Sequence, residues 1–244
     1  RLQARATCRT TDEGVFVSED SPYSTDQHLV YGSVLWDSGL ALSKFFASGG
    51  GAPWRGRRVL ELGTGTGVVA LTLGKLGAAV VATDCEPGVI GLLERNIEAN
   101  ALASSVAVHC LDWGDRATYL RDRRFDVVVA ADVLYSRRDR WLWRALEAHM
   151  DRDRDTVAYL ASPYRQDSPL SGFFDLAAGA GLRVDRLEDG AGRASGGAQG
   201  RPEDVYAGSR FVELSAEGRG AAALRADFGE HNAQRVQIFR LLWP

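Results

Sequence analysis

The residues best suited to chemistry lie between Glu61 and Asp84. A glycine-dense loop at 63–67, with the sequence GTGTG, follows Glu61, and Asp84 ends a short apolar run. Glycines let a ligand approach the main chain because no Cβ stands in the way, and a carboxylate can accept two hydrogen bonds from the hydroxyls of a ribose. This spacing predicts a nucleotide-type binding site. The loop residues predicted to contact the ligand are Gly63, Thr64, Gly65 and Gly67.

Local patterns predict the elements that hold this loop. The apolar run 59–62 is typical of a buried strand, 68–76 of a helix that ends at Gly77, and 80–84 of a second strand. Strand, glycine loop, helix, strand and terminal acid together form a βαβ unit of the nucleotide-binding type.

Two cofactor classes fit the loop. The dinucleotide fingerprint G-x-G-x-x-G fails when it is read from Gly63, and from Gly65 it passes only in a looser form that ends at Ala70, so NAD stays an alternative. The pattern E-x-G-x-G-x-G, which starts at Glu61, resembles motif I of the S-adenosylmethionine-dependent methyltransferases with a Rossmann-like fold. In that motif the loop lies against the methionine part of the cofactor, and Glu61 can serve its ammonium group or a nearby backbone N–H.

Two later strands also end in polar residues. The predicted strand 105–110 is followed by Asp112 and Trp113, and an acid beside an aromatic ring at a strand tip can hold an adenine. The apolar run VVVAA is followed by Asp132 and then Tyr135. Ligands of open α/β sheets bind at the carboxyl ends of the strands, so Asp132 should stand beside the glycine loop. The structural alternative is that the aspartates cap a turn or a helix and that Tyr135 is a packing residue.

The other elements set the fold class. Trp36 lies near the start of an amphipathic helix and is either a packing residue or part of the site, and Trp141 is assigned to the inward face of a later helix. Helices are predicted over 34–46, 87–100, 138–150 and 170–180, and strands over 156–161, 182–188, 211–214 and 234–243. The last strand should form an antiparallel hairpin at the sheet edge, which is typical of methyltransferases and absent from most dehydrogenases. We therefore predict an α/β fold: a Rossmann-like, seven-stranded, mostly parallel sheet with helices on both faces and a C-terminal antiparallel strand.

Length and composition limit the remaining choices. The chain has 244 residues, which suits one domain over 1–244, with 1–33 as an N-terminal arm or lid and 189–204 as a flexible insertion. The net charge of −3 disfavours nucleic acid as a partner. No apolar run approaches the roughly 20 residues of a membrane helix, so no membrane association is expected. Neither the 3 cysteines nor the 4 histidines have metal-ligand spacing, and no metal is predicted. A cytoplasmic location, or a nuclear one, is the simplest expectation.

Considered together, the motifs resemble one family. The pattern is similar to the seven-β-strand protein lysine methyltransferases called methyltransferase family 16, of the methyltransferase-like 21 type. The segments that carry the resemblance are VLWDSGLALSKFF at 34–46, ELGTGTGVV at 61–69, TD at 83–84, LDW at 111–113 and ADVLY at 131–135. The Trp-Asp helix followed by Asp-x-x-Tyr is much more specific than the glycine motif alone.

The resemblance implies an enzyme that methylates lysine in non-histone proteins such as chaperones and translation factors. S-adenosylmethionine would be the donor and S-adenosylhomocysteine the product. Asp132 and Tyr135 would form the substrate motif, in which the aspartate accepts a hydrogen bond from the amine and the tyrosine walls the pocket. The implied cofactor contacts are Trp36, Gly63 to Gly65, Asp84, Trp113 and Ala131. We expect a monomer.

Three alternatives stay open at this point. The same fold serves protein-histidine methyltransferases, which the motifs do not separate from lysine enzymes. It also serves small-molecule and RNA methyltransferases, although ADVLY at 131–135 lacks the Pro-Pro-aromatic motif that is usual in methylation of nucleic-acid bases. A non-catalytic adaptor that keeps the cofactor fold is the third, and the intact glycines and Asp132 argue against it.

Overall fold

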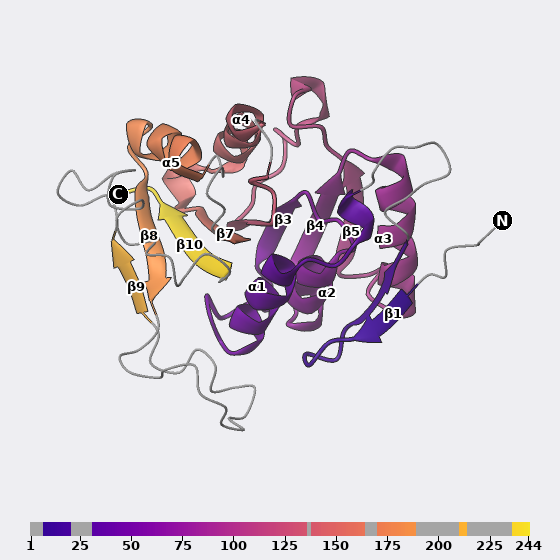
Figure 1. Ribbon diagram of the computed structural model, residues 1–244. Helices are drawn as coiled ribbons and strands as arrows, with labels where there is room; N and C mark the ends of the chain where they lie inside the picture. Colours follow the sequence, from indigo (N-terminus) through magenta and orange to yellow (C-terminus); the bar gives the residue numbers. More distant parts are fainter. Residues whose placement is uncertain (1–6, 21–30, 136–137, 164–169, 189–209, 214–235) are drawn as a thin grey trace.

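The computed structural model is built around an eight-stranded sheet with the order β5-β4-β3-β6-β7-β10-β8-β9 (Figure 1). The residues that the structure describes are 7–20, 31–135, 138–163, 170–188, 210–213 and 236–244. In sheet order the strands are β5 (Val106–Cys110), β4 (Ala79–Asp84), β3 (Arg58–Leu62), β6 (Val127–Ala131), β7 (Val157–Pro163), β10 (Val236–Leu242), β8 (Arg183–Glu188) and β9 (Arg210–Glu213). The predicted seven-stranded fold class is confirmed, and β9 extends that sheet by one strand.

The central strands run parallel. β3 pairs with β4 on one side and with β6 on the other, so that Leu60 lies opposite Val81 and Val128. All three side chains are buried, as expected for strands that helices cover on both faces. Because parallel strands end at the same edge of a sheet, the carboxyl ends of β3 to β6 come together there.

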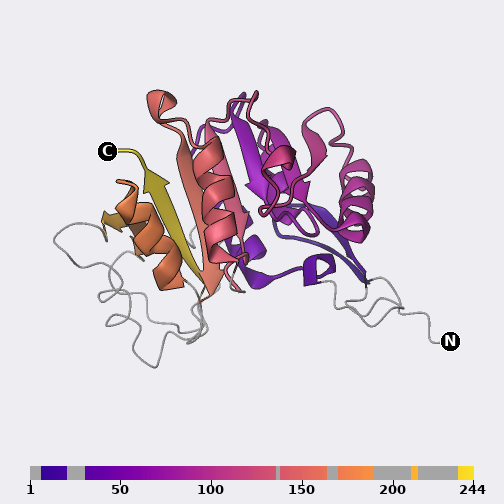
Figure 2. The same cartoon turned by 90° about the horizontal axis from the view of Figure 1, so that it is seen from above.

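The C-terminal strand β10 lies inside the sheet. It pairs antiparallel with β7 on one side and with β8 on the other, and Figure 2 shows the yellow β10 arrow beside β7. The prediction of an antiparallel C-terminal strand is confirmed, but its predicted place at the sheet edge is wrong. Ile238 is buried in the core on one face and Phe239 in the core on the other. A strand buried on both faces is better placed inside a sheet than at its edge.

Helices cover both faces of the sheet, as predicted (Figure 1). Helices α1 (Asp37–Ala47), α2 (Val68–Lys75) and α3 (Pro87–Ala99) share one core with the sheet. Helices α4 (Asp139–His149) and α5 (Leu170–Gly179) share the other. Pro87 opens α3, where its fixed φ suits the first helical turn.

The N-terminal segment forms a hairpin that packs on α3. Strand β1 (Thr7–Thr10), which was not predicted, pairs with β2 (Phe16–Glu19). The side chains of Asn96 and Asn100 accept hydrogen bonds from the backbone N–H groups of Ser18 and Phe16, each at 2.9 Å. The hairpin belongs to the segment 1–33 that was predicted as an arm or lid, and it lies against α3. The short 3-10 helix η1 (Tyr31–Ser33) comes after it in the same segment. Residues 21–30 and the predicted insertion at 189–204 lie outside the described residues.

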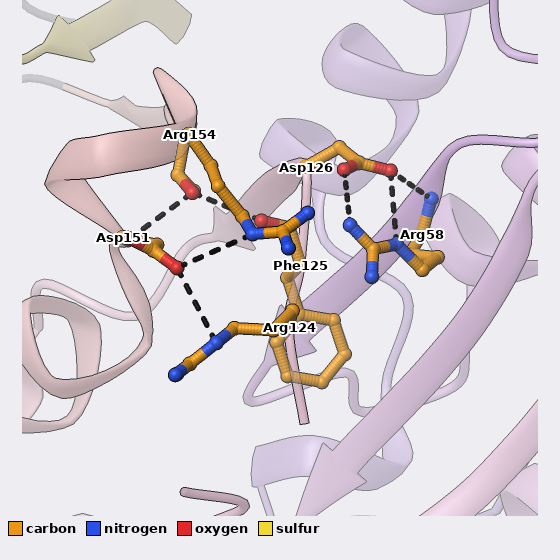
Figure 3. Close-up of polar contacts among 7 residues, drawn as sticks. Arg58, Arg124, Phe125, Asp126, Asp151 and Arg154 are labelled. Carbon is orange, nitrogen blue, oxygen red and sulfur yellow. Dashed lines mark hydrogen bonds and ion pairs between the residues drawn. The ribbon is translucent and has the colours of Figure 1, made fainter. Parts of the chain in front are cut away.

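Ion pairs lie at the amino-terminal ends of the central strands, on the edge of the sheet opposite to the carboxyl ends. Asp126 accepts hydrogen bonds from the backbone N–H of Arg58 at 2.9 Å and from its Nη2 at 2.6 Å (Figure 3). These bonds from the guanidinium hold the pKa of Asp126 below its ordinary value. Asp151 lies 3.4 Å from Nε of Arg124 and 3.7 Å from Nε of Arg154. Because these pairs are partly exposed, water screens them and each contributes little to stability.

His149 predicts how stability should respond to pH. Its buried ring donates from Nδ1 to the carbonyl of Ala145 at 2.6 Å and accepts at Nε2 from the N–H of Leu120 at 3.0 Å, which requires a neutral imidazole. Burial lowers the pKa of His149. Below about pH 6.5, His149 is protonated in the unfolded chain but stays neutral in the folded chain. The free energy of unfolding should therefore fall as pH drops. Urea unfolding at pH 7.5 and 5.5 should show this loss.

His109 provides the matched control. Its ring contacts the carbonyl of Thr118 at 3.0 Å and is only partly buried. We expect His149→Gln to flatten the pH dependence of unfolding and His109→Gln to leave it in place. An unchanged slope in His149→Gln would mean that other groups cause the acid sensitivity.

Candidate active site

The carboxyl ends of the central strands border a cavity of about 420 Å³. Its wall combines the glycine loop after β3, the tips of β4 and β6, the loop after β5 and the segment from η1 to the start of α1. The volume falls in the range of small-molecule sites. The predicted site residues that line it are Trp36, Glu61, Gly63, Thr64, Gly65, Asp84, Asp112, Trp113, Ala131, Asp132 and Tyr135. The structure therefore brings together residues that are far apart in the sequence.

Gly67 is the predicted site residue that does not line the cavity. It precedes α2 with φ of 89°, and a Cβ there would collide with the side chain of Leu93. Its glycine is therefore needed for packing of the loop against α3.

The two loop glycines at the cavity wall, Gly63 and Gly65, are required by their backbone conformation and by the close packing around them. Gly63 and Gly65 have φ values of 70° and 55°, in the region that disfavours other residues. A Cβ on Gly63 would lie 2.9 Å from Trp113, and one on Gly65 would lie 3.0 Å from the carbonyl oxygen of Gly32. The loop is thus closely covered by η1 on one side and by the β5 exit on the other.

Glu61 places an ionisable group inside the cavity wall. Its side chain is 2% exposed, and its carboxyl accepts a hydrogen bond from the hydroxyl of Thr64 at 2.7 Å. Burial raises the pKa of Glu61 to about 8. The carboxyl therefore keeps its proton at neutral pH unless a cation enters the cavity, and an ammonium group is the kind of ligand that would reverse this.

Replacing Glu61 with glutamine should have opposite effects on stability and on ligand binding. Glu61 has an ordinary pKa of 4.5 and a folded-state pKa of about 8. The unfolded chain therefore loses this proton first, and the wild type should lose stability as pH rises through that window. The glutamine variant has no carboxyl to titrate, so its melting temperature should rise relative to that of the wild type between pH 5 and 8. Its affinity for S-adenosylmethionine, the predicted cofactor, should fall by about tenfold because a charge-assisted contact is lost.

Thermal melts across this pH window and calorimetric titrations test the two effects separately. Thr72→Val is a matched control, since the buried Thr72 hydroxyl bonds only to its own helix, at the carbonyl of Val68. If Glu61→Gln binds the cofactor like the wild type, Glu61 serves packing of the loop and not the ligand.

Asp84 ties the end of β4 to the glycine loop. Its carboxyl accepts hydrogen bonds from the backbone N–H groups of Gly65 at 3.2 Å, Cys85 at 2.9 Å and Glu86 at 3.2 Å. Burial raises its pKa despite these donors. A carboxylate has about four acceptor positions, so capacity for a ribose hydroxyl remains.

The pair after β5 supplies an acid and a ring. The Asp112 carboxyl accepts from the N–H of Gly114 at 2.8 Å, while Asp115 and not Asp112 caps the following 3-10 helix η2 (Arg116–Thr118). Trp113 is fixed by its contact with the loop and by the Tyr119 hydroxyl, which donates to its carbonyl at 2.6 Å. The alternative prediction was that Asp112 caps a turn or a helix. Asp112 does close a turn, but it caps no helix and it also lines the cavity.

Asp132 and Tyr135 stand where β6 ends. Asp132 has a left-handed backbone with φ of 56°, and its carboxyl accepts a hydrogen bond from the Ser38 hydroxyl at 3.0 Å. It does not cap α4, which begins at Asp139. Tyr135 is 51% exposed, and its ring lies 6.0 Å from that of Tyr31. Asp132 therefore caps no described helix, and Tyr135 is not packed in the core.

The sequence did not reveal the rim of the cavity. Tyr31, Arg138 and Trp141 line it, and Trp141 was predicted to point inward. Trp141 is 44% exposed, with the Arg138 guanidinium 5.8 Å from its ring, and the buried tryptophan of α4 is Trp143. Positions two apart on a helix point in nearly opposite directions, so only one of the two rings can face the core, and the prediction for Trp141 was wrong.

Two further features are absent from the described ranges. No group of three or more His, Cys, Asp or Glu side chains could hold a metal ion there. No helix in the same ranges is long and apolar enough to cross a membrane.

Comparison with known proteins points to one family. The model of the family described as lysine methyltransferase matches residues 23–177. Protein N-lysine methyltransferase METTL21A of Danio rerio is 34% identical over 106 residues, which make up 42% of this chain and 48% of that protein. EEF1A lysine methyltransferase 3 of Mus musculus is 32% identical over 142 residues, or 57% of this chain and 59% of that protein. The chain spans about half the length of these curated relatives.

A solved structure supports the fold. Magnesium protoporphyrin IX methyltransferase from Synechocystis PCC 6803, with bound SAM, has a TM-score of 0.52 and 14% sequence identity. The likeness covers 84% of this chain and 78% of that one. At this identity it shows a shared Rossmann-like methyltransferase fold and nothing finer.

Proposed function

Because this chain belongs to the lysine methyltransferase family, we propose that it transfers a methyl group from S-adenosylmethionine to a lysine side chain of a non-histone protein. The observation that carries the proposal is the juxtaposition of two motifs in one cavity. The glycine loop with Glu61 and Asp84 forms one wall, and Asp132 and Tyr135 stand at another.

The cavity fits the cofactor. Carboxyl groups dominate its ionisable lining, with Glu61, Asp84, Glu86, Asp112 and Asp132 against Arg138. The buried Glu61 suits the ammonium of the methionine part, Asp84 a ribose hydroxyl, and Asp112 with Trp113 the adenine. S-adenosylmethionine supplies an electrophilic methyl group on a sulfonium ion. Gly63 and Gly65 adopt positive φ values, which let the loop turn and bring its main chain to the cavity wall.

The substrate motif then acts on the amine. A free lysine has a pKa of about 10.4, so it arrives mostly protonated at neutral pH. A partly dry pocket next to a bound cation lowers that pKa and favours the neutral amine. Asp132 accepts a hydrogen bond from this amine and orients its lone pair, and transfer needs the nitrogen about 3–3.5 Å from the methyl carbon. The Tyr135 ring walls the pocket and favours the cationic product.

The rim supports a protein as the substrate. Tyr31, Trp36, Tyr135 and Trp141 are the exposed large hydrophobic side chains of the described residues, and all four line this cavity. A contiguous group of exposed aromatic rings is typical of a protein-binding surface. The acidic interior attracts a cationic lysine that enters past these rings.

The relatives indicate the kind of partner. One of them is named for EEF1A, and we extend the proposal to a chaperone or translation factor as the substrate of this enzyme. We propose further that the enzyme acts as a monomer in the cytoplasm or nucleus.

Transfer of radiolabelled methyl groups to a cell extract tests the substrate class. The expected result is label in the protein fraction. This label should survive nuclease treatment and removal of small molecules, and it should be absent with the Asp132→Ala enzyme. Label confined to RNA or to small molecules would replace the proposal with one of the other methyltransferase classes. Absence of all label, together with tight cofactor binding, would favour the adaptor.

A further inference from the structure

We propose that Ser38 is a positioning residue that fixes the carboxylate of Asp132 for methyl transfer. This inference rests on the proposed function. The motif that carries the resemblance, Trp-Asp-Ser-Gly at 36–39, thus contributes a hydroxyl to the substrate site from a helix far away in the sequence.

The contact is direct, and it is buried on the serine side. Ser38 is fully buried in the first turn of α1, and its Oγ donates to Oδ2 of Asp132 at 3.0 Å. A neutral donor to an ionised acceptor makes one of the stronger hydrogen bonds in proteins. The bond joins α1 to the end of β6, which lies 94 positions further along the chain.

Asp132 needs an external constraint on its side chain. Its backbone is held by the left-handed conformation and by a hydrogen bond from its N–H to the carbonyl of Ala161 at 2.9 Å. These contacts fix the Cα, and the direction of the carboxylate plane then depends on rotation about the side-chain bonds. The Ser38 hydroxyl restricts that rotation, and an amine bonded to a fixed carboxylate has a fixed lone-pair direction.

The helix that carries Ser38 is itself seated rigidly. A Cβ on Gly39 would lie 2.8 Å from Cγ1 of Val68, so α1 packs very closely against the start of α2. Gly39 and Val68 both line the cavity. The helix that begins immediately after the glycine loop therefore sets the position of the Ser38 hydroxyl.

The test compares Ser38→Ala with Ser43→Ala. Both serines are fully buried on α1, but the Ser43 hydroxyl has no hydrogen-bond partner among the described residues. We expect Ser38→Ala to lower kcat by about ten- to a hundredfold, since a small misplacement of a reacting group is sufficient for that loss. The dissociation constant for S-adenosylmethionine should match that of Ser43→Ala, whereas the melting temperature should be lower, because only Ser38→Ala removes a hydrogen bond.

A crystal structure of Ser38→Ala with S-adenosylhomocysteine provides a readout that does not depend on activity. The Asp132 carboxylate should turn away from its wild-type direction while its Cα stays in place. Unchanged carboxylate geometry, or a kcat equal to that of Ser43→Ala, overturns the proposal. A fall in cofactor affinity that accompanies the fall in kcat makes Ser38 a packing residue and overturns it too. Wild-type enzyme that labels no protein refutes the proposed function instead, and the crystal structure still decides whether Ser38 orients Asp132.

Discussion

Replacing Asp132 with alanine is expected to slow methyl transfer by about a thousandfold or more, while the dissociation constant for S-adenosylmethionine stays within about tenfold. In the proposed function this carboxylate accepts a hydrogen bond from the amine and directs its lone pair. The glycine loop, Glu61 and Asp84 are left intact by the change. Single-turnover rates and calorimetric titrations measure the two quantities separately.

Backbone strain makes asparagine the better control for this position. Alanine at φ of 56° is disfavoured, whereas asparagine tolerates the left-handed region. Asp132→Asn should therefore fold like the wild type, keep one acceptor oxygen and still lose about a hundredfold in rate, since the negative charge is gone. If cofactor binding collapses in both variants, Asp132 supports the fold or the cofactor, and its assignment to the substrate is wrong.

Replacing Asp84 with alanine should weaken cofactor binding by about a hundredfold, which is the second largest effect we expect. One hydrogen bond from a ribose hydroxyl to a carboxylate contributes about 1.5–3 kcal/mol, and the upper end of this range corresponds to about a hundredfold in affinity. The carboxyl also receives the N–H of Gly65, so the loop loses one of its anchors in the same variant. Calorimetry with S-adenosylmethionine and S-adenosylhomocysteine measures the change.

A nearby acid separates the ribose contact from general charge. Glu86 lines the same cavity two positions later and is exposed. Glu86→Ala removes an equal charge and should bind the cofactor like the wild type. An unchanged dissociation constant in Asp84→Ala would refute its role at the ribose, and a lower melting temperature without ligand would show that loop anchoring accounts for part of the effect.

The cofactor half of the site was predictable because it is local in sequence. Gly63 and Gly65 have the positive φ values that a glycine-dense loop implies, and Glu61 and Asp84 end adjacent parallel strands. The parallel order itself places these ends together, so the strand pattern was enough to position Asp132 as well.

The substrate half depended on tertiary contacts that no pattern encodes. Ser38 bonds to Asp132 across 94 positions, and the helical period of α1 shows only that Ser38 is near its start. Tyr31 reaches the rim from a segment whose composition predicted an arm, and Trp141 reaches it from a helix with a second tryptophan available for the core. The interior place of β10 likewise follows from burial on both faces, whereas its sequence was read as an edge.

The proposal that the acceptor is a lysine of a protein can be checked by identifying the methylated atom. Purified enzyme and S-adenosylmethionine carrying a deuterated methyl group are incubated with a cell extract, and peptides are then mapped by tandem mass spectrometry. We expect deuterated methyl groups on the side-chain nitrogen of lysine in one or a few non-histone proteins. These groups should be absent when the enzyme is Asp132→Ala. Deuterated methyl groups found on histidine, or on no protein while RNA or a small molecule carries them, would contradict the proposal.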